Sequence, residues 1–127
     1  SMKIKIIILA IFVISILCVG IVNANKPNIG LVPMITISPS TLIMSAPTPC
    51  VSVHSNIPYN QVDCSTLELS GLLPYLAKSD ARGDLVVKFD GEDVKAIVEL
   101  GPFALTLTGD LIDGTSFAAF DTIIVKP

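Results

Sequence analysis

The chain has 127 residues, a hydrophobic fraction of 51%, a charged fraction of 15% and a formal net charge of −3 at pH 7. That length suits one domain, and the mildly acidic balance without a basic run argues against a nucleic-acid partner. Tryptophan is absent and aromatic residues make up 6% of the chain, so a broad stacking platform for bases or sugars is poorly supplied.

A long apolar stretch follows two lysines at the N-terminus. Lys3 and Lys5 precede residues 6–22, which carry no charge, and the Val-Asn-Ala of residues 22–24 fits the small-x-small pattern of a signal-peptidase site. We predict that residues 1–24 are a secretory signal peptide, cleaved after Ala24. The protein is then expected to be extracellular or attached to the cell surface.

Two alternatives retain this segment. A spanning helix needs about 20 apolar residues, so residues 6–22 lie at the lower limit for an uncleaved anchor helix. A pilin-like filament subunit also begins with an apolar helix, although pilin helices usually carry a glutamate that is missing here. A membrane is therefore an expected partner only if residues 6–22 are retained.

A Pro-, Gly- and Asn-rich linker is expected at residues 25–33, followed by one β domain at residues 34–127. Short runs in this part alternate apolar and polar residues between turn residues, a pattern typical of half-buried strands. Residues 58–61 are expected to form a loop, and residues 71–84 an irregular stretch. The expected strands lie at residues 34–37, 41–44, 50–55, 65–70, 85–89, 103–108 and 117–125.

Two local signals refine this pattern. Asp90 is placed to cap a short helix over residues 91–98, with acidic residues in its first turn. Asp113-Gly114 is a strong hairpin signal between the last two strands. Six or seven strands with one short helix favour an immunoglobulin-like antiparallel β-sandwich of two packed sheets, preceded by the apolar N-terminal helix.

From His54 onward, several turn and strand segments carry a resemblance to a known module. They are Ile57-Pro58 and residues 62–69 (VDCSTLEL), 84–90 (DLVVKFD), 106–109 (TLTG), 113–117 (DGTSF) and 121–123 (DTI). In these segments the chain resembles an Ig-like β-sandwich module found near the C-terminus of secreted and cell-surface proteins of archaea and bacteria. The resemblance implies a fold and carries over no catalytic residue.

Many relatives of that module hold a calcium-type loop before the "LVVKFD" strand. Only Asp80 and Asp84 of its acidic residues remain in this chain. Calcium takes six to eight oxygen ligands, so these two aspartates are the only candidate metal ligands and we expect neither a metal nor a cofactor.

Cys50 and Cys64 remain once the leader, with Cys18, is removed. Two cysteines in a small exported domain favour a disulfide, and closing a loop of about 15 residues would stabilise the domain by about 3 kcal/mol. The alternative is two buried free thiols. A simple hairpin centred near Tyr59 would place Cys50 opposite a residue near Leu69, so the bond would require a less regular turn.

Candidate catalytic residues are few. His54 is the only histidine, and the strand alternation directs it outward beside Ser52. The carboxylates are scattered over positions that suit turns and helix caps, and no nucleophile-elbow pattern is present. Arg82-Gly83-Asp84 spells an adhesion tripeptide, but its composition equally suits an exposed turn. We therefore expect no enzyme.

The function expected from the sequence is a structural or protein-interaction role, with other envelope proteins, extracellular proteins or a second copy as partner. Residues 34–44 are apolar and β-prone, and could pair with the edge strand of a neighbour. Glycan binding or adhesion is an alternative, with Tyr59, Tyr75 and Phe120 as the exposed aromatic residues. A filament subunit built on the N-terminal helix is another.

Overall fold

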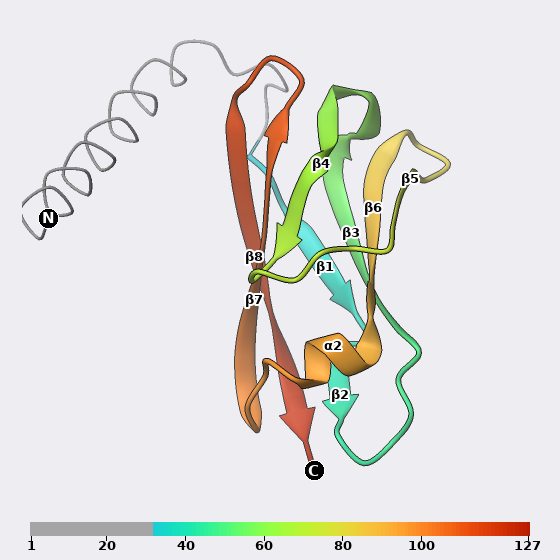
Figure 1. Ribbon diagram of the computed structural model, residues 1–127, viewed down its shortest axis with the longest axis vertical. Helices are drawn as coiled ribbons and strands as arrows, with labels where there is room; N and C mark the ends of the chain where they lie inside the picture. Colours follow the sequence, from blue (N-terminus) through green and yellow to red (C-terminus); the bar gives the residue numbers. More distant parts are fainter. Residues whose placement is uncertain (1–31) are drawn as a thin grey trace, which may run out of the picture. The chain divides into compact units, whose positions relative to one another are not determined.

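Figure 1 shows the computed structural model, which describes residues 32–127; the expected leader or anchor helix at residues 1–24 lies outside the described part. This part contains eight strands, one 3-10 helix and one short α-helix. Their bounds are β1 (Ile35–Ser38), β2 (Thr41–Ile43), β3 (Cys50–Pro58), η1 (Tyr59–Gln61), β4 (Val62–Leu69), β5 (Leu76–Ser79), β6 (Asp84–Asp90), α2 (Gly91–Lys95), β7 (Gly101–Leu111) and β8 (Ser116–Lys126).

The strands form two four-stranded sheets whose buried sides face each other. Sheet A has the order β1-β3-β6-β5 and sheet B the order β2-β8-β7-β4. Neighbouring strands are antiparallel except β2, which runs parallel to β8. The prediction of an all-β domain with two sheets and one short helix is confirmed. Among residues 32–127, no helix is long and apolar enough to cross a bilayer.

The core follows the alternation predicted from the sequence. Buried residues alternate with exposed or half-buried ones along most of the predicted strands, because successive side chains of a strand point to opposite faces. Phe103 and Asp121 are exceptions, since both are only half-buried at positions where the alternation would bury them. The residues predicted to point inward and found buried are Val51, Val53, Leu67, Leu69, Leu85, Val87, Phe89, Leu105, Leu107, Ile123 and Val125. Val86, predicted to face outward, is also buried, and it lies between His54 of β3 and Lys78 of β5.

The first two strands belong to different sheets. β1 pairs with β3 in sheet A, and β2 then pairs with the end of β8 in sheet B. Ile37 and Leu42 are each only 1% exposed, so both strands contribute to the core. Residues 34–44 are therefore part of this chain's own sheets. The expected pairing of this stretch with a neighbour would therefore require β1 or β2 to exchange its own partner strand for one of another chain.

β5 was not expected, and it corrects the predicted irregular stretch at residues 71–84. Ala77 pairs with Val87 of β6, but Leu76 and Lys78 point to the outer face. Leu76 is 42% exposed, so the strand lacks the buried apolar residues that make a strand visible in a sequence. The strand count of six or seven was therefore too low.

The predicted helix is present but shorter, ending at Lys95 rather than near residue 98. The Asp90 carboxylate caps it as expected, accepting hydrogen bonds from Glu92 N at 2.8 Å and Asp93 N at 3.3 Å. A side chain at Gly91 would place its Cβ 1.8 Å from the Thr48 carbonyl oxygen. The helix therefore begins at a residue that only glycine can occupy without moving the backbone.

Ser55 explains an irregularity in β3, where the pairing with β6 shifts register between His54 and Pro58. The Ser55 hydroxyl donates to the Leu85 carbonyl oxygen at 2.8 Å and accepts from Ile57 N at 3.2 Å. It thereby satisfies backbone groups that the shifted ladder leaves unpaired. A buried polar residue here holds two central strands of sheet A together.

Candidate functional site

The two cysteines lie far apart in the described structure. Cys50 begins β3, whereas Cys64 follows the far end of that strand, in β4. The eight steps from Cys50 to Pro58 cover roughly 26 Å at about 3.3 Å per residue, and a disulfide needs Cα atoms within about 7 Å. Both residues are free thiols, so the expected Cys50–Cys64 disulfide is not formed.

Their surroundings differ. The Ser52 hydroxyl, 3.6 Å from Cys50 Sγ, and the Tyr75 hydroxyl lower the pKa of the Cys50 thiol, with Lys88 acting in the same direction. Burial raises the pKa of the Cys64 thiol, and the nearby Asp63 adds to that effect. Cys50 is therefore the more readily ionised thiol.

Asp80 and Asp84 lie in the β5–β6 turn, where their roles are structural. Asp80 Oδ1 accepts hydrogen bonds from Arg82 N at 2.8 Å and Asp84 N at 2.9 Å. The backbone hydrogen bond from Asp84 is the main cause of the lowered pKa of the Asp80 carboxyl. Asp84 lies 3.7 Å from the exposed Arg82 guanidinium, in an ion pair open to solvent. In the described residues no group of three acidic, histidine or cysteine side chains is placed to hold a metal.

His54 lies on the outer face of sheet A, opposite Thr36 of β1 and Val86 of β6. It is exposed, as the alternation predicted. Neither neighbour in register is a nucleophile paired with a carboxylate, so a His54-based catalytic triad finds no support here.

The most distinctive feature of sheet B is that β8 is much longer than β2, the strand at its outer side. β8 has eleven residues and pairs along its length with β7, but β2 has three and covers only Ile124, Val125 and Lys126. Among the described residues, no strand pairs with the rest of β8 on that side, although β1 of sheet A bonds to β8 at Asp121. The arrangement of these strands can be followed in Figure 1. We call the stretch Ser116–Phe120 the open edge of β8.

The hydrogen-bond pattern identifies the backbone groups at this edge. Ile124 donates its N–H to the Ser40 carbonyl oxygen at 2.9 Å, away from β7. In an antiparallel strand, the backbone N–H and C=O groups of every second residue point to the same side of the strand. Ser116, Ala118 and Phe120 therefore direct both their N–H and their C=O groups toward the open edge.

Asp121 closes the edge at one end. Its carboxylate accepts from Thr122 N at 2.9 Å and from Ile37 N of β1, also at 2.9 Å. This single side chain joins the borders of the two sheets and satisfies the next outward N–H along β8. The open edge is therefore bounded by the Asp113-Gly114 hairpin and by Asp121.

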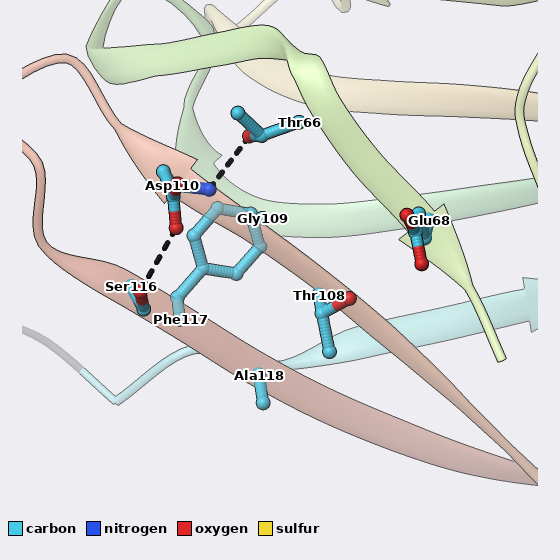
Figure 2. Close-up of a pocket in the computed structure, with 8 residues that line it drawn as sticks. All are labelled: Thr66, Glu68, Thr108, Gly109, Asp110, Ser116, Phe117 and Ala118. Carbon is cyan, nitrogen blue, oxygen red and sulfur yellow. Dashed lines mark hydrogen bonds between the residues drawn. The ribbon is translucent and has the colours of Figure 1, made fainter. Parts of the chain in front are cut away.

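A shallow hollow of about 450 Å³ lies on sheet B beside the open edge. Figure 2 shows its lining from three strands: Thr66 and Glu68 of β4, Thr108 and Asp110 of β7, and Ser116 and Ala118 of β8, with Phe117 over Gly109. The hollow forms where the β4–β7 pairing is interrupted between Asp63 and Glu68. Thr66 Oγ1 replaces part of the missing ladder by accepting from Asp110 N at 2.8 Å.

Sequence reasoning identified neither of these surface features. The length difference between the expected strands at 41–44 and 117–125 is the signal that could have indicated an uncovered edge. The carboxylates were expected to be scattered over turns and helix caps, and only the register places Glu68 and Asp110 beside the same hollow. Phe120, an expected exposed aromatic residue, is 66% exposed on the same face.

The comparisons with known proteins give no relative for this chain. No family model, no curated protein and no solved structure matches it. The resemblance of residues 54–127 to secreted modules therefore stays a prediction.

Proposed function

We propose that the chain is a non-enzymatic interaction module of the cell surface or extracellular space, and that it associates with a second copy through the open edge of β8. The observation that carries this proposal is the row of backbone groups at Ser116, Ala118 and Phe120 that have no partner within residues 32–127. Such a row is a template for adding a strand from another chain. The partner we commit to is another copy of this protein.

An immunoglobulin-like sandwich is the fold we propose for the two sheets. Its support is the division of the first strand between sheets, with β1 beside β3 and β2 parallel to β8. Export rests on the N-terminal sequence pattern, and the free thiols of Cys50 and Cys64 add nothing to it.

A comparison of the sheet borders singles out β8. β1 and β5 have four residues each, and β2 has three. Lys78 places a charge on β5, at the edge of sheet A. β4 carries Asp63 and Glu68 and an irregular register. Short length, charge and irregularity all protect an edge from pairing. The segment Ser116–Phe120 has no charge, proline or glycine, so it lacks these protections.

The open edge is complementary to itself. In an antiparallel arrangement with a two-fold axis at Ala118, that residue would pair with its own copy and Ser116 with Phe120 of the second copy. The three pairs would form about six hydrogen bonds. The small Ala118 side chains at the axis cause no crowding, and Phe120 stays on the outer face of the enlarged sheet.

The expected association is weak, because a five-residue strand is short beside the 20–30 residues a side of a standard interface. The main-chain hydrogen bonds formed by strand addition replace hydrogen bonds to water, so each contributes little net free energy. We therefore expect a dimer that forms with rising protein concentration.

The test removes one edge donor without touching the β7 ladder. Ala118→Pro deletes the N–H that faces the open edge, a position where a strand tolerates proline. Ala118→Thr is the matched control, since it keeps the N–H and favours a strand. Light scattering of the full chain in detergent micelles should give a concentration-dependent dimer for the wild type and Ala118→Thr, and a monomer for a folded Ala118→Pro.

A dimer that survives in folded Ala118→Pro would refute the proposed edge. Circular dichroism of each variant establishes that the fold is retained. If the proline variant unfolds, Ala118→Lys provides a second test, because like charges would meet at the two-fold axis and should abolish the dimer.

A further inference from the structure

Some polar groups that line the hollow on sheet B are hydrogen-bonded within the chain, and others have no partner among the described residues. Ser116 Oγ donates to Asp110 Oδ1 at 2.8 Å, and Thr66 Oγ1 donates to the Asp63 carbonyl oxygen at 2.7 Å (Figure 2). These bonds hold Asp110 in place from two sides, together with the bond from Asp110 N to Thr66. The hollow therefore has a preorganised polar wall.

Three polar groups at the hollow have no hydrogen-bond partner among the described residues. They are the Glu68 carboxylate, the Thr108 hydroxyl and Asp110 Oδ2. Glu68 and Thr108 are opposite each other in the register, and Ala118 follows on the next strand of the same row. The available groups are mainly acceptors of O–H bonds, with one hydroxyl that can donate as well.

An aromatic ring lies one row further along the same face. Phe120 pairs with Thr106, whereas Ala118 pairs with Thr108, so the two rows are about 7 Å apart along β8. Phe120 is 66% exposed, and its apolar ring is offered to solvent on the outer face of sheet B. A ligand longer than one row can contact the polar groups and this ring at the same time.

We propose that this surface binds a neutral saccharide. The sugar hydroxyls donate to the carboxylates of Glu68 and Asp110, and a C–H face of the next sugar ring packs on Phe120. A shallow site on a sheet face, lined by both polar and apolar atoms, suits an extended ligand that carries both hydroxyl groups and C–H faces. Two carboxylates in one hollow repel an acidic saccharide, so the site selects neutral over anionic sugars. The proposal does not depend on self-association through the open edge.

The experiment titrates the isotope-labelled full chain, in phosphocholine micelles free of sugar detergents, with three probes. Mannohexaose and cellohexaose are neutral, and hexagalacturonate is anionic. At least one neutral probe should shift the amide resonances of Thr108, Ser116 and Phe120, and hexagalacturonate should bind more weakly. Phe120→Ala and Thr108→Val should each lower the affinity for the neutral probe by about tenfold.

A matched control lies on the same face of sheet B, in β8. Thr122→Val makes the same chemical change as Thr108→Val, but Thr122 pairs with Ala104 beyond the Phe120 row. It should leave the affinity unchanged. The proposal is overturned if neither neutral probe shifts these resonances, if hexagalacturonate binds as tightly, or if Thr122→Val and Thr108→Val have equal effects. Thermal unfolding of the variants excludes loss of fold as the cause.

Discussion

Sheets A and B have the same number of strands but present different outer surfaces. Sheet A buries Val86 on its outer face between His54 and Lys78, and its β3 irregularity is filled by Ser55. Sheet B leaves part of β8 uncovered, exposes Phe120 and opens a hollow beside Glu68. Both sheets have edge strands, but those of sheet A, β1 and β5, have only four residues each. The self-association and the saccharide site that we propose both use sheet B, so we expect substitutions in sheet A to affect mainly stability.

The largest expected effect is a difference in stability between two Phe→Ala variants, one in each sheet. Phe89 of sheet A is fully buried, so Phe89→Ala should lower the free energy of unfolding by about 3–5 kcal/mol. Phe120→Ala in sheet B should change it by less than about 0.5 kcal/mol, because the ring is exposed. Urea unfolding of both variants checks this contrast, and equal losses would contradict the division of roles.

The next effect concerns the buried hydroxyl of sheet A. Ser55→Ala leaves Ile57 N and the Leu85 carbonyl without their partner, which should cost about 1–3 kcal/mol. Ser65→Ala is the control, since the Ser65 hydroxyl bonds only to exposed Asp63. Urea unfolding again provides the measurement, and a Ser55→Ala variant as stable as Ser65→Ala would disprove the role of the buried bond.

A smaller effect is expected from pH. The pKa of Asp80 is lower in the folded chain than its ordinary value of about 3.9. Its contribution to stability is therefore present above that ordinary value and is lost as the pH falls through the lowered pKa. The difference in unfolding free energy between the wild type and Asp80→Ala should shrink toward acid pH. A difference that stays constant would contradict the hydrogen bonds at Arg82 and Asp84.

The smallest expected effect is a difference in thiol reactivity between the two cysteines, which leaves the fold intact. Cys50, with its lowered thiol pKa, should be alkylated by iodoacetamide at a lower pH than Cys64, whose thiol pKa is raised. Peptide mass spectrometry across a pH series separates the two sites. Ser52→Ala should move the Cys50 profile toward that of Cys64, and an unmoved profile would argue against the hydroxyl as the main cause.

Much of the fold was predictable because it rests on local signals. The alternation of Val51 and Val53, the Asp90 cap and the Asp113-Gly114 turn each follow from a few neighbouring residues. β5 escaped prediction because it is an edge strand whose pairing with β6 provides the order that its sequence lacks.

The surface features were beyond sequence reasoning for a different reason. The expected disulfide depended on a turn that would bring Cys50 to Cys64, but β3 continues to Pro58 before the chain reverses. The hollow depends on the register between β4 and β7, and the open edge on how little of β8 is covered by β2. Such cross-strand relations are set by tertiary packing.

Amide hydrogen exchange along β8 tests the central claim most directly, because it compares the open edge with the covered end of one strand. In the full chain at low concentration, Ala118 and Phe120 should exchange rapidly, while Ile124, bonded to Ser40, should exchange slowly. At high concentration the two edge amides should slow and Ile124 should not change. Edge amides that are already protected at the lowest concentration, or that stay rapid at the highest, would contradict self-association through β8.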